Sequence, residues 1–237
     1  MKTRFFLLVL AVSTCAEGIS GEPNETITSG AKLDWICISK DGSHFAYSQS
    51  GKRFLAWGFN YDRDYNFRLL EEYWDSEWST VATHFKEMKA LGANVVRIHL
   101  SVARFVKSPR ETDAAALEKL ARLLNLAEES GLYLDITGLG CYRKTDVPEW
   151  YNAMSEAERW GVQALFWSGV AKTCAQSPAV FCYDLMNEPV LPASGRKETE
   201  WMAGELSGLS YTQRLTLDLA GRTQEQVIKG WVEKLVH

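Results

Sequence analysis

The chain of 237 residues has no excess of positive charge, no glycine-rich phosphate loop and no cysteine spacing typical of a metal site. Its formal net charge of −4 argues against nucleic acid as the main partner. The missing glycine-rich loop after the first predicted strand argues against a nucleotide-binding fold. The sequence therefore predicts no cofactor, no metal and no nucleic-acid partner.

Long apolar runs are also missing. The run from Phe5 to Val12, preceded by Lys2 and Arg4, is too short to span a membrane and is typical of an export signal. We therefore expect a signal peptide at residues 1–20 and a secreted or periplasmic protein. The same stretch resembles a bacterial lipoprotein box, which leaves lipidation of Cys15 as the alternative. No later stretch predicts a membrane span.

Four cysteines follow the predicted signal: Cys37, Cys141, Cys174 and Cys182. In an exported protein they can pair as disulfides. They can equally be buried as small hydrophobic residues. The sequence leaves both interpretations open.

Hydrophobic residues make up 46% of the chain, enough for a substantial core. Residues 39–54 predict a β-hairpin, which places an N-terminal segment at residues 21–53. After it, strand and helix patterns alternate. Predicted strands begin near residues 54, 93, 132 and 179, and predicted helices cover 78–91, 113–130, a segment from 155 and a segment from 223. This regular alternation predicts an α/β fold of the (β/α)8 TIM-barrel type, with about the first four β/α units present in residues 54–237.

In such barrels the functional residues lie at the carboxyl ends of the strands. Polar and aromatic residues occur at each predicted strand end: Asn60 and Tyr61, Arg97 and His99, Tyr142, and Asn187 and Glu188. Structural roles are the alternative for Arg97, His99 and Asn60. Asp135 and Asp184 lie inside their strands, which favours a structural role for both. For Glu188, a structural role explains neither the neighbouring Asn187 nor the proline that follows.

Three motifs together resemble a known family. Gly58-Phe59-Asn60-Tyr61, Asn94-Val95-Val96-Arg97 and Asp184-Leu185-Met186-Asn187-Glu188-Pro189 are similar to the first, second and fourth strands of glycoside hydrolase family 5. This is the cellulase and β-mannanase family of the Asn-Glu-Pro clan of retaining glycosidases. The resemblance spans about residues 50–237. Many members have a histidine at the end of the third strand, where this chain has Ile136-Thr137-Gly138.

The resemblance implies catalytic roles for three residues. Glu188 would be the general acid/base, which protonates the leaving glycosidic oxygen and then activates water. Asn187 would hydrogen-bond the sugar 2-hydroxyl, and Arg97 would orient the nucleophilic carboxylate. Asn60 and His99 would contact substrate. Flat aromatic faces stack on pyranose rings, and the candidates for such stacking are Trp57, Tyr61, Tyr142 and Trp150.

The resemblance also implies a second carboxylate, a nucleophilic Glu at the end of strand seven. Only 49 residues follow Glu188, whereas three more strands need on the order of 120 residues. We therefore expect the N-terminal half of a barrel that cleaves cellulose- or mannan-like β-linked polysaccharide, inactive on its own. The alternative is a non-catalytic carbohydrate-binding remnant. Open barrel edges also predict self-association.

Overall fold

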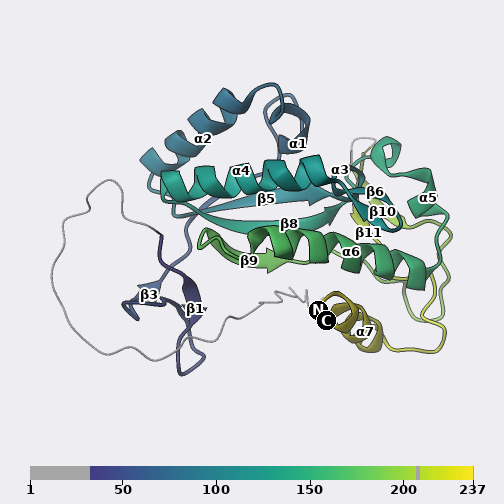
Figure 1. The fold of residues 1–237 in the computed structure, drawn as a ribbon. Helices are drawn as coiled ribbons and strands as arrows, with labels where there is room; N and C mark the ends of the chain where they lie inside the picture. The colour runs from purple at the N-terminus through teal and green to yellow at the C-terminus, as the bar shows by residue number, and fades with distance from the viewer. Residues whose placement is uncertain (1–32, 207–208, 237) are drawn as a thin grey trace. The chain divides into compact units, whose positions relative to one another are not determined.

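The structure is a computed structural model that describes residues 33–206 and 209–236 (Figure 1). The predicted signal peptide, residues 1–20, and Cys15 lie outside the described residues. Within the described ranges, no helix has the length and apolar character needed to cross a membrane.

Helices and strands alternate along most of the chain (Figure 1). The helical elements are α1 (Leu70–Tyr73), α2 (Trp78–Ala90), α3 (Val102–Phe105), α4 (Ala114–Ser130), the short 3-10 helix η1 (Lys144–Asp146), α5 (Glu149–Asn152), α6 (Glu156–Cys174) and α7 (Gln224–Val236). The strands are β1 (Ile36–Ile38), β2 (Phe45–Tyr47), β3 (Arg53–Phe54), β4 (Gly58–Tyr61), β5 (Val95–Ser101), β6 (Val106–Ser108), β7 (Glu111–Thr112), β8 (Tyr133–Gly140), β9 (Val180–Asp184), β10 (Met202–Leu206) and β11 (Leu209–Gln213).

The main sheet has the strand order β4-β5-β8-β9. β4 and β5 are parallel, with Gly58 opposite Val95 and Asn60 opposite Arg97. Each strand neighbours the next sheet strand along the chain, as in successive units of a (β/α)8 barrel. The predicted parallel α/β fold is confirmed, and its four strands are the four that the sequence predicted.

The residues group into two compact units. Among the described residues, the first unit contains 33–98, 121–136 and 174–183, and the second contains 99–120, 137–173, 184–206 and 209–236. The chain therefore passes from the first unit to the second within β5 and within β8, and again at the last residue of β9.

The core of the first unit is aromatic. Phe54, Val95 and Tyr133 form a buried cluster, and the rings of Phe54 and Tyr133 meet edge to face with centroids 5.2 Å apart. Phe54 belongs to the antiparallel sheet β1-β2-β3, which contains the hairpin predicted for residues 39–54. Side chains of this small sheet therefore pack against apolar side chains of the parallel strands.

The first strand of the parallel sheet does not begin near residue 54, as the sequence predicted. β4 begins only at Gly58, and the side chains of Leu55 and Trp57 are 65% and 55% exposed. The backbone N–H of Trp57 donates to the side chain of Asn94 at 2.7 Å, so this segment is held by a side chain before regular pairing begins. β4 is also an edge strand, so an apolar sequence here does not imply burial.

The second unit contains a hairpin that the sequence analysis missed. Residues 191–219 have no clear periodicity, yet β10 and β11 pair antiparallel, with Met202 opposite Gln213. Trp201, Met202 and Ala203 are all buried. This burial follows from contacts with distant segments, which local hydrophobic patterns do not reveal.

Each of the four described cysteines is a thiol and not half of a disulfide bond. Cys141, Cys174 and Cys182 are buried, which confirms their interpretation as small hydrophobic residues. Burial raises the pKa of Cys141 and of Cys174 to about 12, so both thiols stay neutral near pH 7.

Candidate active site

The first unit supplies the whole of β4 and the first half of β5. Asn60 of β4 and Arg97 of β5 are register partners there, so Arg97 lies within its strand and not at the carboxyl end. The side-chain amide of Asn60 donates to Oδ1 of Asp62 at 3.2 Å, and Nε of Arg97 lies 3.8 Å from Oδ2 of Asp135. Arg97 therefore pairs with a carboxylate of another strand. This contact fits the structural role that the sequence left open as the alternative for Arg97. Asn60 is exposed at the strand end.

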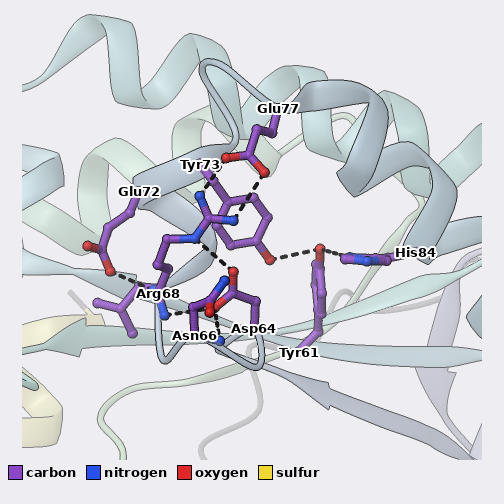
Figure 2. A network of polar contacts seen from close by, with 9 residues as sticks. Tyr61, Asp64, Asn66, Arg68, Glu72, Tyr73, Glu77 and His84 are labelled. Carbon is purple, nitrogen blue, oxygen red and sulfur yellow. Dashed lines mark hydrogen bonds and ion pairs between the residues drawn. The ribbon is translucent and has the colours of Figure 1, made fainter.

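The two aromatic candidates of the first unit differ in exposure. Trp57 is exposed, and its ring meets Phe59 edge to face with centroids 5.7 Å apart. Tyr61 is buried, and its hydroxyl accepts from the hydroxyl of Tyr73 at 2.9 Å and lies 2.7 Å from Nδ1 of His84 (Figure 2). Trp57 thus offers a free ring face, whereas Tyr61 anchors β4 to α1 and α2.

The second unit places His99 beside Tyr142. Both side chains are buried, and Nδ1 of His99 forms a hydrogen bond with the Tyr142 hydroxyl. A Cβ at Gly140 would lie 2.6 Å from Cε2 of Tyr142, so glycine at the end of β8 lets this ring pack closely. The pair brings together two of the predicted substrate contacts, both in the interior.

The end of β9, the fourth strand of the parallel sheet, is held by side-chain hydrogen bonds. β9 ends at Asp184, whose Oδ2 accepts a hydrogen bond from Oγ1 of Thr137 at 3.1 Å. The next carbonyl, of Leu185, accepts from Nε1 of Trp167 at 3.2 Å. The strand carboxylate therefore has a local structural partner. Thr137 lies within β8, which continues to Gly140, so the predicted end of the third strand at residue 137 is too early.

Glu188 lies four residues beyond this strand and is exposed. Its φ of 46° is in the left-handed region, a conformation that costs a non-glycine residue about 1–3 kcal/mol and clusters at functional sites. On its far side, the backbone N–H of Val190 donates to the Gln213 carbonyl at 2.9 Å. Hydrogen bonds on both sides therefore fix the turn that presents the carboxylate, with Asn187 half-buried beside it.

The remaining aromatic candidate, Trp150, belongs to α5. It is half-buried, and its ring meets Tyr151 edge to face with centroids 5.8 Å apart. A nearby cavity of about 310 Å³ is lined by Lys144, Asn152, Thr199, Glu200, Trp201 and Met202. That volume is at the lower end of the range for small-molecule sites, roughly 300–1,000 Å³. Trp201, not Trp150, is the aromatic residue of this cavity, and it lies in residues 191–219, which have no clear periodicity.

Across residues 33–206 and 209–236, no three His, Cys, Asp or Glu side chains come together in a way that could hold a metal ion. The candidate residues in and just after the parallel strands are instead two amides, one arginine and one carboxylate: Asn60, Asn187, Arg97 and Glu188.

Several solved structures share this fold at low sequence identity. The GH5_18 protein from Bifidobacterium longum subsp. longum ATCC 55813 is 14% identical, with a TM-score of 0.54, and the match covers 77% of this chain and 40% of that chain. For the exo-beta-1,4-mannosidase Op5Man5 from Opitutaceae bacterium strain TAV5, identity is 19%, the TM-score is 0.51, and coverage is 69% and 28%.

A third structure, a GH5_18 variant from Streptomyces cattleya in complex with Manb1-4GlcNAc, is 16% identical with a TM-score of 0.53. The match covers 76% of this chain and 40% of that chain. The chain thus spans less than half the length of the solved structures that it resembles. None of the curated proteins to which the sequence was compared matches it.

A family model settles the relationship. The model described as cellulase (glycosyl hydrolase family 5) matches residues 48–233, which is most of the chain. The match includes all three motifs that carried the resemblance, which form β4, begin β5 and follow from the last residue of β9. The chain belongs to glycoside hydrolase family 5.

Proposed function

We propose that this chain supplies the acid/base half of a secreted glycoside hydrolase that cleaves a cellulose- or mannan-like β-linked polysaccharide with retention. The observation that carries the proposal is the exposed carboxylate of Glu188, held in a strained turn just after the fourth parallel strand. It stands beside Asn187 in the family's Asn-Glu-Pro motif.

In this proposal Glu188 acts twice. It first donates its proton to the glycosidic oxygen, so that the leaving sugar departs as a neutral alcohol. As a carboxylate it then removes a proton from the water that attacks the glycosyl-enzyme intermediate. Asn187 hydrogen-bonds the 2-hydroxyl of the sugar at the reacting centre. Arg97, paired with Asp135, orients the nucleophilic carboxylate.

A retaining hydrolase needs a second carboxylate, about 5 Å from the first. Among the described residues, no second glutamate follows a strand of the parallel sheet at its carboxyl end. The chain covers 40% of the first solved structures that it resembles. We therefore expect the nucleophile from the remaining part of a longer protein, and no hydrolysis of a β-glycan by the purified 237-residue chain.

The structural neighbours favour a β-linked substrate that contains mannose. One is named an exo-beta-1,4-mannosidase, and another was solved in complex with Manb1-4GlcNAc. The apolar run at residues 5–12 supports export, so that a polysaccharide outside the cell is accessible to the enzyme. We propose β-1,4-mannosides first and β-1,4-glucans second as the substrates to assay.

The test uses the product of the native gene read past codon 237. In that protein Glu188→Gln should lower kcat on β-1,4-glycans by about 10²- to 10⁴-fold, because general acid–base catalysis contributes that much. Aryl glycosides with good leaving groups need no proton, so the loss in their cleavage step should be smaller. Glu149→Gln, a change at an exposed glutamate of α5, is the matched control. Equal losses on both substrate types would contradict the proposed role.

The second candidate function is carbohydrate binding without catalysis. The exposed ring of Trp57 and the cavity beside Trp201 favour it, since neither needs a nucleophile. Isothermal titration with β-1,4-linked hexasaccharides would show binding by a protein whose natural full-length product releases no reducing sugar. Hydrolysis by that product would rule out this alternative.

We also propose self-association of the isolated chain. β4 and β9 are the two edges of the parallel sheet, and Leu55 and Trp57 are exposed just before β4. Unpaired edges and exposed apolar side chains favour association between copies. Light scattering should report a mass above that of the monomer, and a monodisperse monomer at high concentration would contradict this proposal.

A further inference from the structure

A tight turn follows the carboxyl end of β4. Residues Arg63 and Leu69 form an antiparallel bridge, and between them the backbone N–H of Asp64 donates to the carbonyl of Arg68 at 3.0 Å. The N–H of Phe67 donates back to the carbonyl of Asp64, also at 3.0 Å. Asp64 and Arg68 thus flank a three-residue hairpin loop, residues 65–67. The residue that ends such a loop adopts a left-handed conformation and is usually glycine.

Charged side chains hold this turn rigidly (Figure 2). Oδ1 of Asp64 accepts from the backbone N–H groups of Asn66 and Arg68, both at 2.9 Å, and Oδ2 accepts from Nε of Arg68 at 2.8 Å. The guanidinium of Arg68 reaches on to Glu77, with N–O distances of 2.5 and 3.1 Å. It also lies 4.9 Å above the ring of Tyr73. Both ends of the turn are therefore fixed to the start of α2.

The turn presents two aromatic side chains to solvent. Tyr65 is 90% exposed and Phe67 is 71% exposed. Phe67 has a φ of 62°, the conformation in which glycine carries no steric penalty and a bulky residue is strained. Burial does not offset this strain, because most of the ring is in water. A phenylalanine at this position is thus unfavourable for folding alone.

We propose that Tyr65 and Phe67 form a stacking surface for pyranose rings of the β-linked glycan, an inference that rests on the proposed function. Flat aromatic faces pack against the C–H faces of sugars. The turn begins at Arg63, two residues after β4 ends, and so follows a strand end of the kind where barrel enzymes place their substrates. Arg68 is the shared partner of Asp64 and Glu77, and these two carboxylates with one guanidinium keep a net negative charge, which disfavours an anionic ligand. A turn that is already rigid also lowers the entropy cost of binding.

The test measures binding of β-1,4-linked mannohexaose and cellohexaose to the 237-residue chain by isothermal titration calorimetry. Tyr65→Ala and Phe67→Gly should each raise the Kd, and the double variant should raise it by at least about tenfold. Phe67→Trp keeps an aromatic face and should restore most of the affinity. Trp35→Ala, at an exposed aromatic residue just before β1, is the matched control and should leave the Kd unchanged.

Thermal unfolding of the same variants separates binding from folding. Phe67→Gly should unfold at the same temperature as the parent or at a higher one, so weaker binding cannot reflect a damaged fold. Unchanged Kd values in both variants of a sugar-binding parent would overturn the stacking surface and leave the proposed function standing. A parent that binds neither hexasaccharide would overturn the stacking surface, whereas the proposed function is overturned only by the Glu188→Gln test in the longer protein. A change of mass in light scattering with no change in Kd would assign the two rings to self-association.

Discussion

Each of the two units contains an arginine that packs on a tyrosine ring, but the surroundings of the two arginines differ. In the first unit, Arg68 lies above Tyr73 and bonds two carboxylates near the surface (Figure 2). In the second, the guanidinium of Arg159 lies 3.7 Å above the ring of Tyr151 and 4.4 Å above that of Trp201, and the side chain is fully buried.

The hydrogen bonds of the two arginines differ accordingly. Arg159 donates to the carbonyl of Tyr151 and to Oε1 of Gln213, both at 2.7 Å, and these acceptors are neutral. A chain of neutral groups continues inward, because Nε2 of Gln163 donates to the Tyr151 hydroxyl at 2.8 Å and Nε1 of Trp231 donates to Gln163 at 2.7 Å. This network joins α5, α6, α7 and β11.

The pKa values of the two arginines shift in opposite directions. Hydrogen bonds to Glu77, and then to Asp64, raise the pKa of Arg68. Burial lowers the pKa of Arg159, because desolvation disfavours the charged form. The first network is therefore an arrangement of charges in water, sensitive to pH and salt. The second is a buried network of hydrogen bonds, sensitive to the loss of any partner.

The largest effect is expected from breaking the buried network. Arg159→Ala should lower the free energy of unfolding by about 3–5 kcal/mol, because it leaves a cavity and removes a hydrogen bond from each of the buried oxygen atoms of Gln213 and Tyr151. Arg159→Met fills most of that volume and removes the cost of burying a cation, so it should cost less. Urea unfolding of both variants measures the difference. Equal losses of unfolding free energy would contradict this expectation.

Breaking the exposed network should cost less. Arg68→Ala removes two surface ion pairs, which salt screens and which contribute little each. The loss in unfolding free energy should be smaller than for Arg159→Ala and should shrink further in 1 M NaCl. An equal loss of unfolding free energy in the two variants, independent of salt, would show that the exposed and the buried arginine stabilise the protein in the same way.

Acid should open the first network before it affects the second. Burial would raise the pKa of Asp64, but hydrogen bonds from Arg68 and Asn66 outweigh it and lower the pKa, and the bond from Arg68 lowers that of Glu77. Carboxylates with a lowered folded pKa stabilise the fold above their unfolded pKa, about 3.9 for Asp and 4.3 for Glu. That contribution is lost as pH falls through the lower folded values.

The reporters for this acid transition are the amides of Asn66 and Arg68, which donate to Asp64. Their hydrogen-exchange protection, corrected for intrinsic rates, should fall below about pH 4. In Asp64→Asn the fall should disappear, because the amide oxygen of asparagine does not titrate in this range. Protection that stays constant down to pH 2 in the parent would show that these charges do not hold the turn.

The same contrast explains what the sequence could predict. The parallel strands and the helices α2, α4, α6 and α7 follow from local periodicity, and the Asn-Glu-Pro segment from a short motif. The buried network does not, because Tyr151 and Gln213 are 62 residues apart and each looks like an ordinary residue in its own segment. Of the aromatic candidates, Trp57 is exposed but Tyr61 and Tyr142 are buried. The sequence identifies an aromatic residue but not whether its ring is exposed to solvent.

The smallest stability change is expected at the tip of the exposed turn. Phe67→Gly removes a left-handed phenylalanine, whose strain is about 1–2 kcal/mol. It also adds the extra unfolded-state entropy of glycine, about 0.5–1 kcal/mol. The unfolding free energy should therefore be unchanged or rise by up to about 1 kcal/mol. Phe67→Ala keeps the positive φ without the ring, so it should gain nothing over the parent. Urea unfolding resolves this pair, and a loss of more than about 1 kcal/mol in Phe67→Gly would mean that the ring packs against the turn rather than facing solvent.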